Sequence, residues 1–278
     1  MAYRVTLLAA PRASNIAEAQ AAGMLALEYA LREKRCFATA MALKQGGRVY
    51  GLYEAVEPGV EENRVYRRIT GGSRAEVDAS WSYVAAAVPG RADMRQLAAV
   101  ALGAASCLRD HAWFTHAGGV GFVEAFTPLE PGEALDCLLE ALGASRAGKV
   151  LLPRQSLAEQ ARLFRGEGWR LYRYQRGDAE AEVRRNGYWA RLSLGLLDGY
   201  VSDYWLTGVF YAAPPSEIYS VLNSLKGTRF DELVLFNLEI AVEKRLDVYG
   251  LEKSDIVELL RRLHEAIGEK YYTVPSKT

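Results

Sequence analysis

The amino-acid sequence predicts an α+β fold with a mixed, mostly antiparallel sheet and flanking helices, followed by a small C-terminal α+β domain. The composition, 50% hydrophobic and 24% charged over 278 residues, is that of an ordinary globular protein. Short apolar segments are separated mostly by glycine-containing turns, which disfavours a parallel Rossmann-type sheet. The character of the chain changes after about Gly177, where charged residues dominate.

These observations predict two domains. We expect the first over residues 1–178, a charged connector at about 178–186, the second over residues 186–268, and a flexible tail at 269–278.

The first domain should contain hairpins and helices in alternation. Asn15 followed by Glu18 is typical of a helix start, because the two side chains can cap it reciprocally. Gly46-Gly47 indicates a hairpin between the flanking strands. In chain order, we expect a strand at 3–8, a helix from 15 to about 35, strands at 36–43, 48–55, 64–69 and 81–88, a helix at 92–109, strands at 112–115 and 120–126, helices at 133–142 and 156–164, and a strand at 169–174.

The second domain should begin with a hairpin. Asp198-Gly199 is a strong turn signal between apolar strands at 188–197 and 200–207. Pro214-Pro215 then opens the first of three helices, since proline suits the first helical turn. We expect these helices at 217–225, 230–249 and 254–267.

Charge and hydropathy exclude several classes of partner. The formal net charge is zero and the pI is near 6.9, so nothing indicates nucleic acid or an acidic membrane surface. No apolar segment is long enough to span a bilayer, and the first residues lack the order of a signal peptide. We therefore expect a cytoplasmic protein.

Cysteine chemistry is not expected. Cys36, Cys107 and Cys137 are odd in number and far apart, which argues against a disulfide framework or a metal site. Cys107 and Cys137 lie beside leucines in helical patterns and are interpreted as small core residues rather than nucleophiles.

The segment Arg67-Arg68-Ile69-Thr70-Gly71-Gly72 is the best candidate site. Arginine provides a permanent charge and a planar fork for carboxylate or phosphate, and paired glycines let backbone N–H groups approach an anion. If the arginines bind ligand, Arg68→Ala should abolish binding and leave the melting temperature nearly unchanged. Asp78 follows as a hydrogen-bonding, metal-binding or simple turn residue.

Residues 67–78 resemble the signature loop of the lipoate–protein ligase and biotin–protein ligase catalytic family, and Trp81-Ser82-Tyr83 is similar to the segment that follows it there. The stretch from Thr207 to Tyr211, with Leu225-Lys226-Gly227, is similar to the accessory domain of lipoate–protein ligases. The resemblance implies that lipoate or octanoate is activated with ATP and transferred to a lysine of a carrier protein, with Mg²⁺ as a candidate metal. It places Arg67, Arg68, Thr70, Gly71, Gly72 and Asp78 at the adenylate.

The sequence departs from the family pattern at residues that matter for catalysis. Gly118 stands where the family has its active-site lysine, and no lysine occurs between Gln45 and Gly148. Val77 replaces a histidine and Val209 replaces an aspartate. Three functions therefore remain open: an active ligase, a catalytically degenerate homologue that binds acyl-adenylate or pairs with an active ligase, and an ATP-independent octanoyl or lipoyl transferase.

Overall fold

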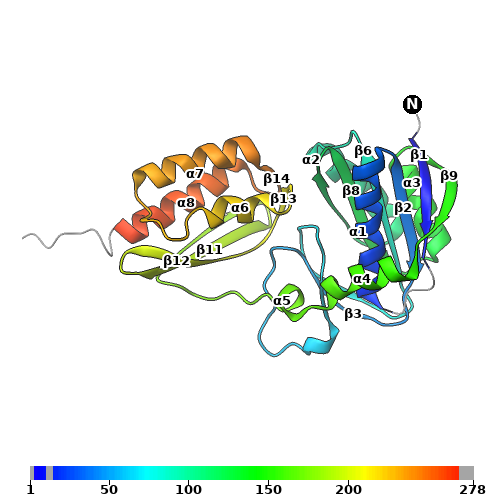
Figure 1. The fold of residues 1–278 in the computed structure, drawn as a ribbon, viewed down its shortest axis with the longest axis horizontal. Coiled ribbons are helices and arrows are strands. Elements are labelled where there is room, and N and C mark those ends of the chain that lie inside the picture. Colours follow the sequence, from blue (N-terminus) through cyan, green and yellow to red (C-terminus); the bar gives the residue numbers. More distant parts are fainter. Residues whose placement is uncertain (1–2, 11–14, 269–278) are drawn as a thin grey trace, which may run out of the picture. The chain divides into compact units, whose positions relative to one another are not determined.

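The computed structural model describes residues 3–10 and 15–268. The chain divides into two compact units, which are drawn in Figure 1. Unit 1 comprises Met1–Leu52 and Val56–Tyr172, and unit 2 comprises Tyr53–Ala55 and Arg173–Thr278.

Unit 1 combines helices with two sheets. Its helices are α1 (Ile16–Glu33), α2 (Met94–Leu108), α3 (Pro131–Ala141), α4 (Arg154–Arg165) and α5 (Glu167–Arg170). Its strands are β1 (Tyr3–Ala9), β2 (Cys36–Ala42), β3 (Gly47–Tyr50), β4 (Val65–Arg67), β5 (Ala75–Val77), β6 (Ser82–Pro89), β7 (Ala112–Ala117), β8 (Val120–Thr127) and β9 (Ala144–Leu151).

The larger sheet of unit 1, called the central sheet below, has the strand order β7-β8-β6-β2-β1-β9. β1 pairs in parallel with β2 and β9, whereas the remaining neighbours pair antiparallel. Helix α1 packs against β6, β2 and β8 on one face, and α2 and α3 lie on the other (Figure 1). Central strands buried on both faces are expected to be mostly apolar, and β6 and β8 are so apart from a few buried polar residues, among them Glu124 on β8.

A smaller sheet with the order β4-β3-β5 carries the predicted anion loop. β3 pairs with β4 in parallel and with β5 antiparallel. Tyr50, Val56 and Val65 form a buried cluster beside it. The loop between β4 and β5 therefore starts and ends on neighbouring parts of one small sheet.

Unit 2 contains a hairpin sheet covered by helices. Its strands are β10 (Ala179–Arg185), β11 (Tyr188–Leu197), β12 (Tyr200–Val209), β13 (Tyr211–Ala213) and β14 (Asp247–Tyr249), and its helices are α6 (Glu217–Asn223), α7 (Glu232–Arg245) and α8 (Lys253–Ile267). β10, β11 and β12 pair antiparallel, and α8 packs on β10 and β11 (Figure 1). Asp198 and Gly199 both have positive φ, as a tight hairpin turn requires.

The segment Tyr53–Ala55 is held by β12 and the residues after it. The N–H of Gly208 donates to the carbonyl of Tyr53, and the N–H of Ala55 donates to the Thr207 hydroxyl at 3.1 Å. The Tyr53 ring stacks on Phe210 with 4.5 Å between the ring centroids. The Thr-Gly-Val-Phe stretch singled out in the sequence therefore binds a segment from far earlier in the chain.

The predicted fold class, α+β with a mixed and mostly antiparallel sheet, is confirmed. The hairpin predicted across Gly46-Gly47 is wrong, because β2 pairs within the central sheet and β3 within the small one. Glycine is required here because other main-chain atoms pass very close: a Cβ at Gly47 would lie 2.6 Å from the carbonyl oxygen of Arg64. The glycine pair therefore marks a close backbone contact and not a hairpin turn.

Three further local predictions are also wrong. The strand expected at 169–174 is replaced by the short helix α5, and the charged connector is the strand β10. In β10, alternating Ala179, Ala181 and Val183 are buried, so the charged residues between them merely face outward. The expected helix at 230–249 ends at Arg245 and is followed by β14. The flexible tail predicted at 269–278 lies outside the described residues.

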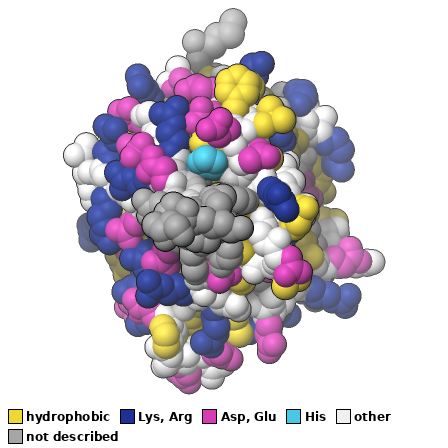
Figure 2. All heavy atoms as spheres, turned by 90° about the vertical axis from the view of Figure 1, so that its left-hand side faces the viewer, with side chains coloured by type: hydrophobic (Ala, Val, Ile, Leu, Met, Phe, Trp, Pro, Cys, Tyr) yellow, Lys and Arg dark blue, Asp and Glu magenta, His cyan; other side chains and the backbone are white. Residues whose placement is uncertain are grey.

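No described helix is both long and apolar enough to cross a membrane. On the face seen in Figure 2, acidic and basic side chains are interspersed without a large region of one sign. This distribution agrees with the zero formal net charge.

Candidate functional site

The arginine–glycine loop, residues 67–74, runs from the end of β4 towards β5. Gly72 has a φ of +84°, a conformation that favours glycine. A Cβ on Gly51 would overlap the carbonyl oxygen of Gly72, so Gly51 is also required for the loop to pass. Gly71 and Gly72 are buried, whereas Ser73 and Arg74 are exposed.

The guanidinium of Arg68 is fully buried and holds the loop from inside. Its nitrogens donate to the Thr70 hydroxyl at 3.1 Å and to the carbonyl oxygens of Gly71 and Ser73 at 3.0 and 2.8 Å. The group also lies 3.9 Å above the Trp113 ring centroid, a cation–π distance. Arg68 therefore binds the carbonyl side of the loop.

The charge of Arg68 is matched by Glu124 on β8. The Glu124 carboxylate accepts hydrogen bonds from the Thr70 hydroxyl at 2.6 Å and from the Tyr83 hydroxyl at 2.9 Å. Both hydrogen bonds are donated to the carboxylate, which is the pattern of its ionised form. Arg68, Thr70, Tyr83 and Glu124 are each at most 1% exposed. We call these four residues the buried charge cluster.

Burial dominates the titration of this cluster. It raises the pKa of Glu124, while the nearby Arg68 and the hydrogen bonds from Thr70 and Tyr83 act in the opposite direction. Burial, together with the Glu124 charge, raises the pKa of Tyr83 well above its ordinary value. Tyr83 therefore remains a hydrogen-bond donor at neutral pH.

Arg67 ties the start of the loop to neighbouring segments. Its side chain is 2% exposed and donates to the carbonyl oxygens of Gly51, Leu52 and Trp169 at 2.8–3.0 Å. The carbonyl of Arg67 accepts from the Gln20 amide at 3.2 Å and from the Trp169 indole at 3.0 Å. Trp169 on α5, where the sequence predicted a strand, thus forms two hydrogen bonds with Arg67.

Both arginine side chains are thus buried and donate to main-chain carbonyl oxygens of unit 1, and the ligand-binding role expected from the sequence stays a prediction. Full burial of Arg68 is also inconsistent with the expectation that Arg68→Ala leaves the melting temperature unchanged. Within residues 3–10 and 15–268, the main-chain N–H groups of Gly71 and Gly72 form no hydrogen bond. Their role as anion donors stays a prediction.

Asp78 lies apart from the buried charge cluster. It is exposed and lines a polar cavity of about 700 Å³ together with Gly46, Arg48 and Glu76. None of residues 67–72 lines that cavity. The structure therefore brings Arg68 and Thr70 together, whereas Asp78 lines a cavity that the arginine–glycine residues 67–72 do not reach.

Gly118 lies in the turn between β7 and β8 with a φ of +53°. A Cβ there would lie 2.7 Å from a methyl carbon of Leu31, so a longer side chain would require the Leu31 side chain to move. Glu124 lies six positions further along the chain, in the interior of β8.

The cysteines differ from the expectation. Cys107 on α2 and Cys137 on α3 form a disulfide, with a Cα–Cα distance of 5.9 Å. The two cysteines are 30 positions apart in the sequence, which gives no sign of the pairing; they meet because α2 packs against α3. Cys36 is buried and burial raises the pKa of its thiol, so it is a poor nucleophile.

Sequence reasoning missed Glu124, Gln20 and Trp113 as members of this site, and it cited Tyr83 only for its resemblance. One signal could have found Glu124. It is the acidic residue in the otherwise apolar or small stretch Val120–Thr127, where a buried carboxylate needs a cationic partner.

Comparisons with known proteins bear on the fold. No protein-family model and no curated protein sequence matches the chain. The structure is similar to P. falciparum LipL1 in complex with lipoate, with a TM-score of 0.63 and 9% identity over 94% of this chain and 99% of that one. A bi-partite lipoate protein ligase from Thermoplasma acidophilum has a TM-score of 0.44 and 13% identity, over 62% and 96%. Lipoate-protein ligase A bound with ATP has the same TM-score and identity, over 61% and 98%.

The similarity to LipL1 spans both units of the chain. It shows that this chain has the fold of that lipoate-bound protein.

Proposed function

We propose that this chain is a lipoate–protein ligase-like protein that activates lipoate or octanoate with ATP and transfers the acyl group to a lysine of a carrier protein. The observation that carries the proposal is the similarity to LipL1, a protein solved with lipoate, along 94% of the chain. The signature-like loop supports it, because the main-chain N–H groups of its glycines suit the carboxylate or phosphate of an acyl-adenylate.

In the proposed reaction, negative charge develops where the acyl carboxylate and the α-phosphate meet. The N–H groups of Gly71 and Gly72 would stabilise that charge, because rigid donors in a dry site need no reorganisation. Arg68 would fix their direction through its hydrogen bonds to the loop carbonyls. The acyl carboxylate would attack the α-phosphorus of ATP and release pyrophosphate, and the carrier lysine would then attack the acyl carbon and release AMP and a proton. Within residues 3–10 and 15–268, no group of three or more His, Cys, Asp or Glu side chains could hold a metal ion.

A degenerate homologue is the second candidate, and the region around Gly118 favours it. The family's lysine would stabilise the phosphate, and loss of one such charge stabiliser commonly costs about 10²–10³ in rate. Here the position is a glycine packed towards Leu31. Such a protein would bind acyl-adenylate, or pair with an active ligase, without transferring the acyl group.

An ATP-independent transferase that uses a thiol receives no support from the cysteines. Cys107 and Cys137 are bonded to each other, and Cys36 is buried. A transferase that uses another nucleophile is distinguished from the ligase by the transfer experiment described next.

Two measurements separate the candidates. Isothermal titration with lipoate or octanoate, alone and with ATP, tests binding, and mass spectrometry of an added lipoyl-carrier domain tests transfer. Transfer that requires ATP supports the ligase. Tight binding without acyl mass on the carrier supports the degenerate homologue. Transfer from a pre-acylated carrier without ATP supports the transferase, and absence of both binding and transfer rejects all three.

A matched pair of variants tests the loop. Thr70→Val removes the hydroxyl that joins Arg68 to Glu124, and affinity should fall at least about tenfold. Thr115→Val is the control, because its hydroxyl is equally buried but has no partner in the described part of the chain. Equal affinities in the two variants would show that the loop does not form the site.

A further inference from the structure

Helix α7 carries more apolar side chains than unit 2 covers. Of its side chains only Leu238 and Val242 are buried within the described residues. Leu233 is 67% exposed and Phe236 is 58% exposed. A helix that is apolar around most of its circumference is expected to be covered on more than one side. An apolar side of α7 is therefore open to a partner.

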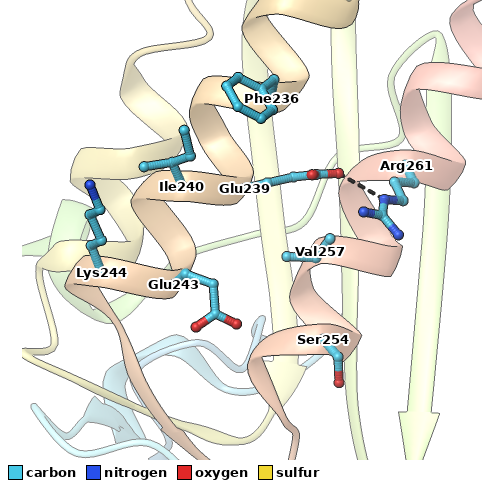
Figure 3. Close-up of a pocket in the computed structure, with 8 residues that line it drawn as sticks. All are labelled: Phe236, Glu239, Ile240, Glu243, Lys244, Ser254, Val257 and Arg261. Carbon is cyan, nitrogen blue, oxygen red and sulfur yellow. Dashed lines mark hydrogen bonds and ion pairs between the residues drawn. The ribbon is translucent and has the colours of Figure 1, made fainter.

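The exposed apolar residues lie in one stripe along α7. Leu233, Phe236 and Ile240 follow one another at spacings of three and four, so their side chains project from one side of the helix. The stripe borders a groove of about 440 Å³ whose walls are α7 and α8 (Figure 3). Phe236 and Ile240 line this groove from α7, and Val257 lines it from α8. Stripe and groove together form one apolar surface, which we call the α7 face.

Side chains of opposite charge stand at the two ends of the α7 face. Glu232 opens the helix and is exposed, and Lys244 lies in the last turn and borders the groove. Within residues 3–10 and 15–268, neither side chain forms a hydrogen bond or an ion pair. By contrast, Glu239 beside the groove pairs with Arg261 at 2.7 Å (Figure 3). The charges at the ends of the face are therefore available to a partner.

A second copy of α7 in antiparallel orientation complements both the charges and the groove. Glu232 and Lys244 lie at nearly equal distances from the middle of the 14-residue helix, so a two-fold axis there brings Glu232 of one copy beside Lys244 of the other. Phe236 of each copy then reaches the part of the groove that Ile240 and Val257 of the other copy line. Parallel packing would instead bring like charges together at both ends.

We propose that this chain forms a two-fold symmetric dimer through the α7 face, with the two copies of α7 packed antiparallel. Burial of Leu233 and Phe236 in both copies favours association. The two Glu232–Lys244 pairs determine the relative direction of the helices, since charge pairs at the margin of an interface contribute more to specificity than to affinity. A single pair of helices is a small interface, so we expect a reversible dimer with a Kd of about 1–100 μM.

Sedimentation velocity of the full chain, at concentrations from about 1 to 200 μM, tests the proposal. The unchanged chain should pass from monomer to dimer over this range. Phe236→Asp places an unpaired charge in the apolar face of each copy and should raise the Kd at least about tenfold. The control is Leu102→Asp, which changes a similarly exposed leucine on α2 of unit 1 and should leave the Kd unchanged.

Charge reversal tests the antiparallel direction. Glu232→Lys would place two lysines together at both ends of the dimer, and Lys244→Glu would place two glutamates there. Each variant alone should therefore dimerise about three- to tenfold more weakly than the unchanged chain. An equal mixture of the two variants should regain the affinity of the unchanged chain, because the mixed dimer contains only pairs of opposite charge.

Three results would overturn the proposal. The first is a chain that stays monomeric over the whole concentration range, which would assign the α7 face to another partner. The second is a dimer whose Kd is the same in the unchanged chain and in Phe236→Asp. The third is a mixture of Glu232→Lys and Lys244→Glu that associates no better than either variant alone.

Discussion

The hydroxyl of Thr70 donates a 2.6 Å hydrogen bond to the carboxylate of Glu124, although 54 positions separate the two residues in the chain. This contact joins the arginine–glycine loop to β8 of the central sheet. Arg68 donates to the same hydroxyl, so the loop and the sheet share one buried pair of opposite charges. The shape of the proposed binding loop therefore depends on a residue of the central sheet.

Removing either member of this pair should destabilise unit 1. Glu124→Leu leaves the Arg68 charge buried and Arg68→Met leaves the Glu124 charge buried, and each should cost about 3–5 kcal/mol in the free energy of unfolding. The double variant should cost clearly less than the sum, because no unpaired charge remains. Urea unfolding measures all three.

Glu140→Gln on the exposed side of α3 is the control for this cycle and should change stability by less than about 0.5 kcal/mol. Additive costs in the double variant would show that Arg68 and Glu124 are not coupled.

Glycine-to-alanine changes in two helices should have opposite effects. Helix propensity favours alanine by about 0.5–1 kcal/mol in both cases. Gly103→Ala on α2 has room, since the nearest atom lies 3.9 Å from the new Cβ, and should stabilise. Gly23→Ala on α1 would overlap the Tyr83 hydroxyl and displace it from Glu124, so it should destabilise. The melting temperatures of the two variants test this prediction. A higher melting temperature in both variants would show that the Tyr83 hydroxyl does not lie against Gly23.

Tyr53→Ala should destabilise unit 2, although the residue lies between stretches of unit 1 in the sequence. The Tyr53 side chain is 1% exposed, stacks on Phe210 and donates a hydrogen bond to the carbonyl of Pro215 at 3.1 Å. Loss of a buried aromatic side chain costs about 3–5 kcal/mol. Amide hydrogen exchange of residues 205–213 should accelerate, whereas Tyr200→Ala, 44% exposed, should leave it nearly unchanged.

Acid should weaken unit 2 through Asp255. The hydrogen bonds from Arg185 hold the pKa of Asp255 below its ordinary value, and the N–H of Glu252 adds to this effect. The stabilisation is present above the ordinary carboxyl pKa of about 3.9 and is lost as the pH falls through the lowered value in the folded state. Asp255→Asn should therefore cost about 1 kcal/mol near neutral pH, as expected for a helix cap.

Melting curves between pH 6 and pH 2 check this dependence: the difference between the unchanged chain and Asp255→Asn should shrink towards the acid end. Asp136→Asn, which changes a carboxylate that is 68% exposed, is the control and should have nearly the melting temperature of the unchanged chain. A constant difference for Asp255→Asn would contradict the assignment.

Reduction of the Cys107–Cys137 disulfide should lower stability by roughly 3–4 kcal/mol, the value expected for a loop of about 30 residues. Alkylation without reductant should leave both cysteines unlabelled. A Cys107→Ser, Cys137→Ser double variant should be insensitive to reductant. Labelling of both cysteines in the unreduced chain would show free thiols.

Local signals predicted much of the fold. The Asn15 cap of α1, the Asp198-Gly199 turn and the hairpin of β7 and β8 all form as expected, because each depends on residues within a few positions of one another. The edge strand β9 was missed, since its exposed and partly charged residues carry no apolar period. β10 was missed because its charges concealed a period of two.

The sequence by itself determined where helices and turns form, and it marked the arginine–glycine loop as unusual. Only the tertiary structure decided what those arginines touch: Arg68 is enclosed by its own loop, by Trp113 and by the other members of the buried charge cluster. The physical reason is that a buried charge requires a partner, and the chain supplies that partner from a distant strand whose register no local pattern encodes.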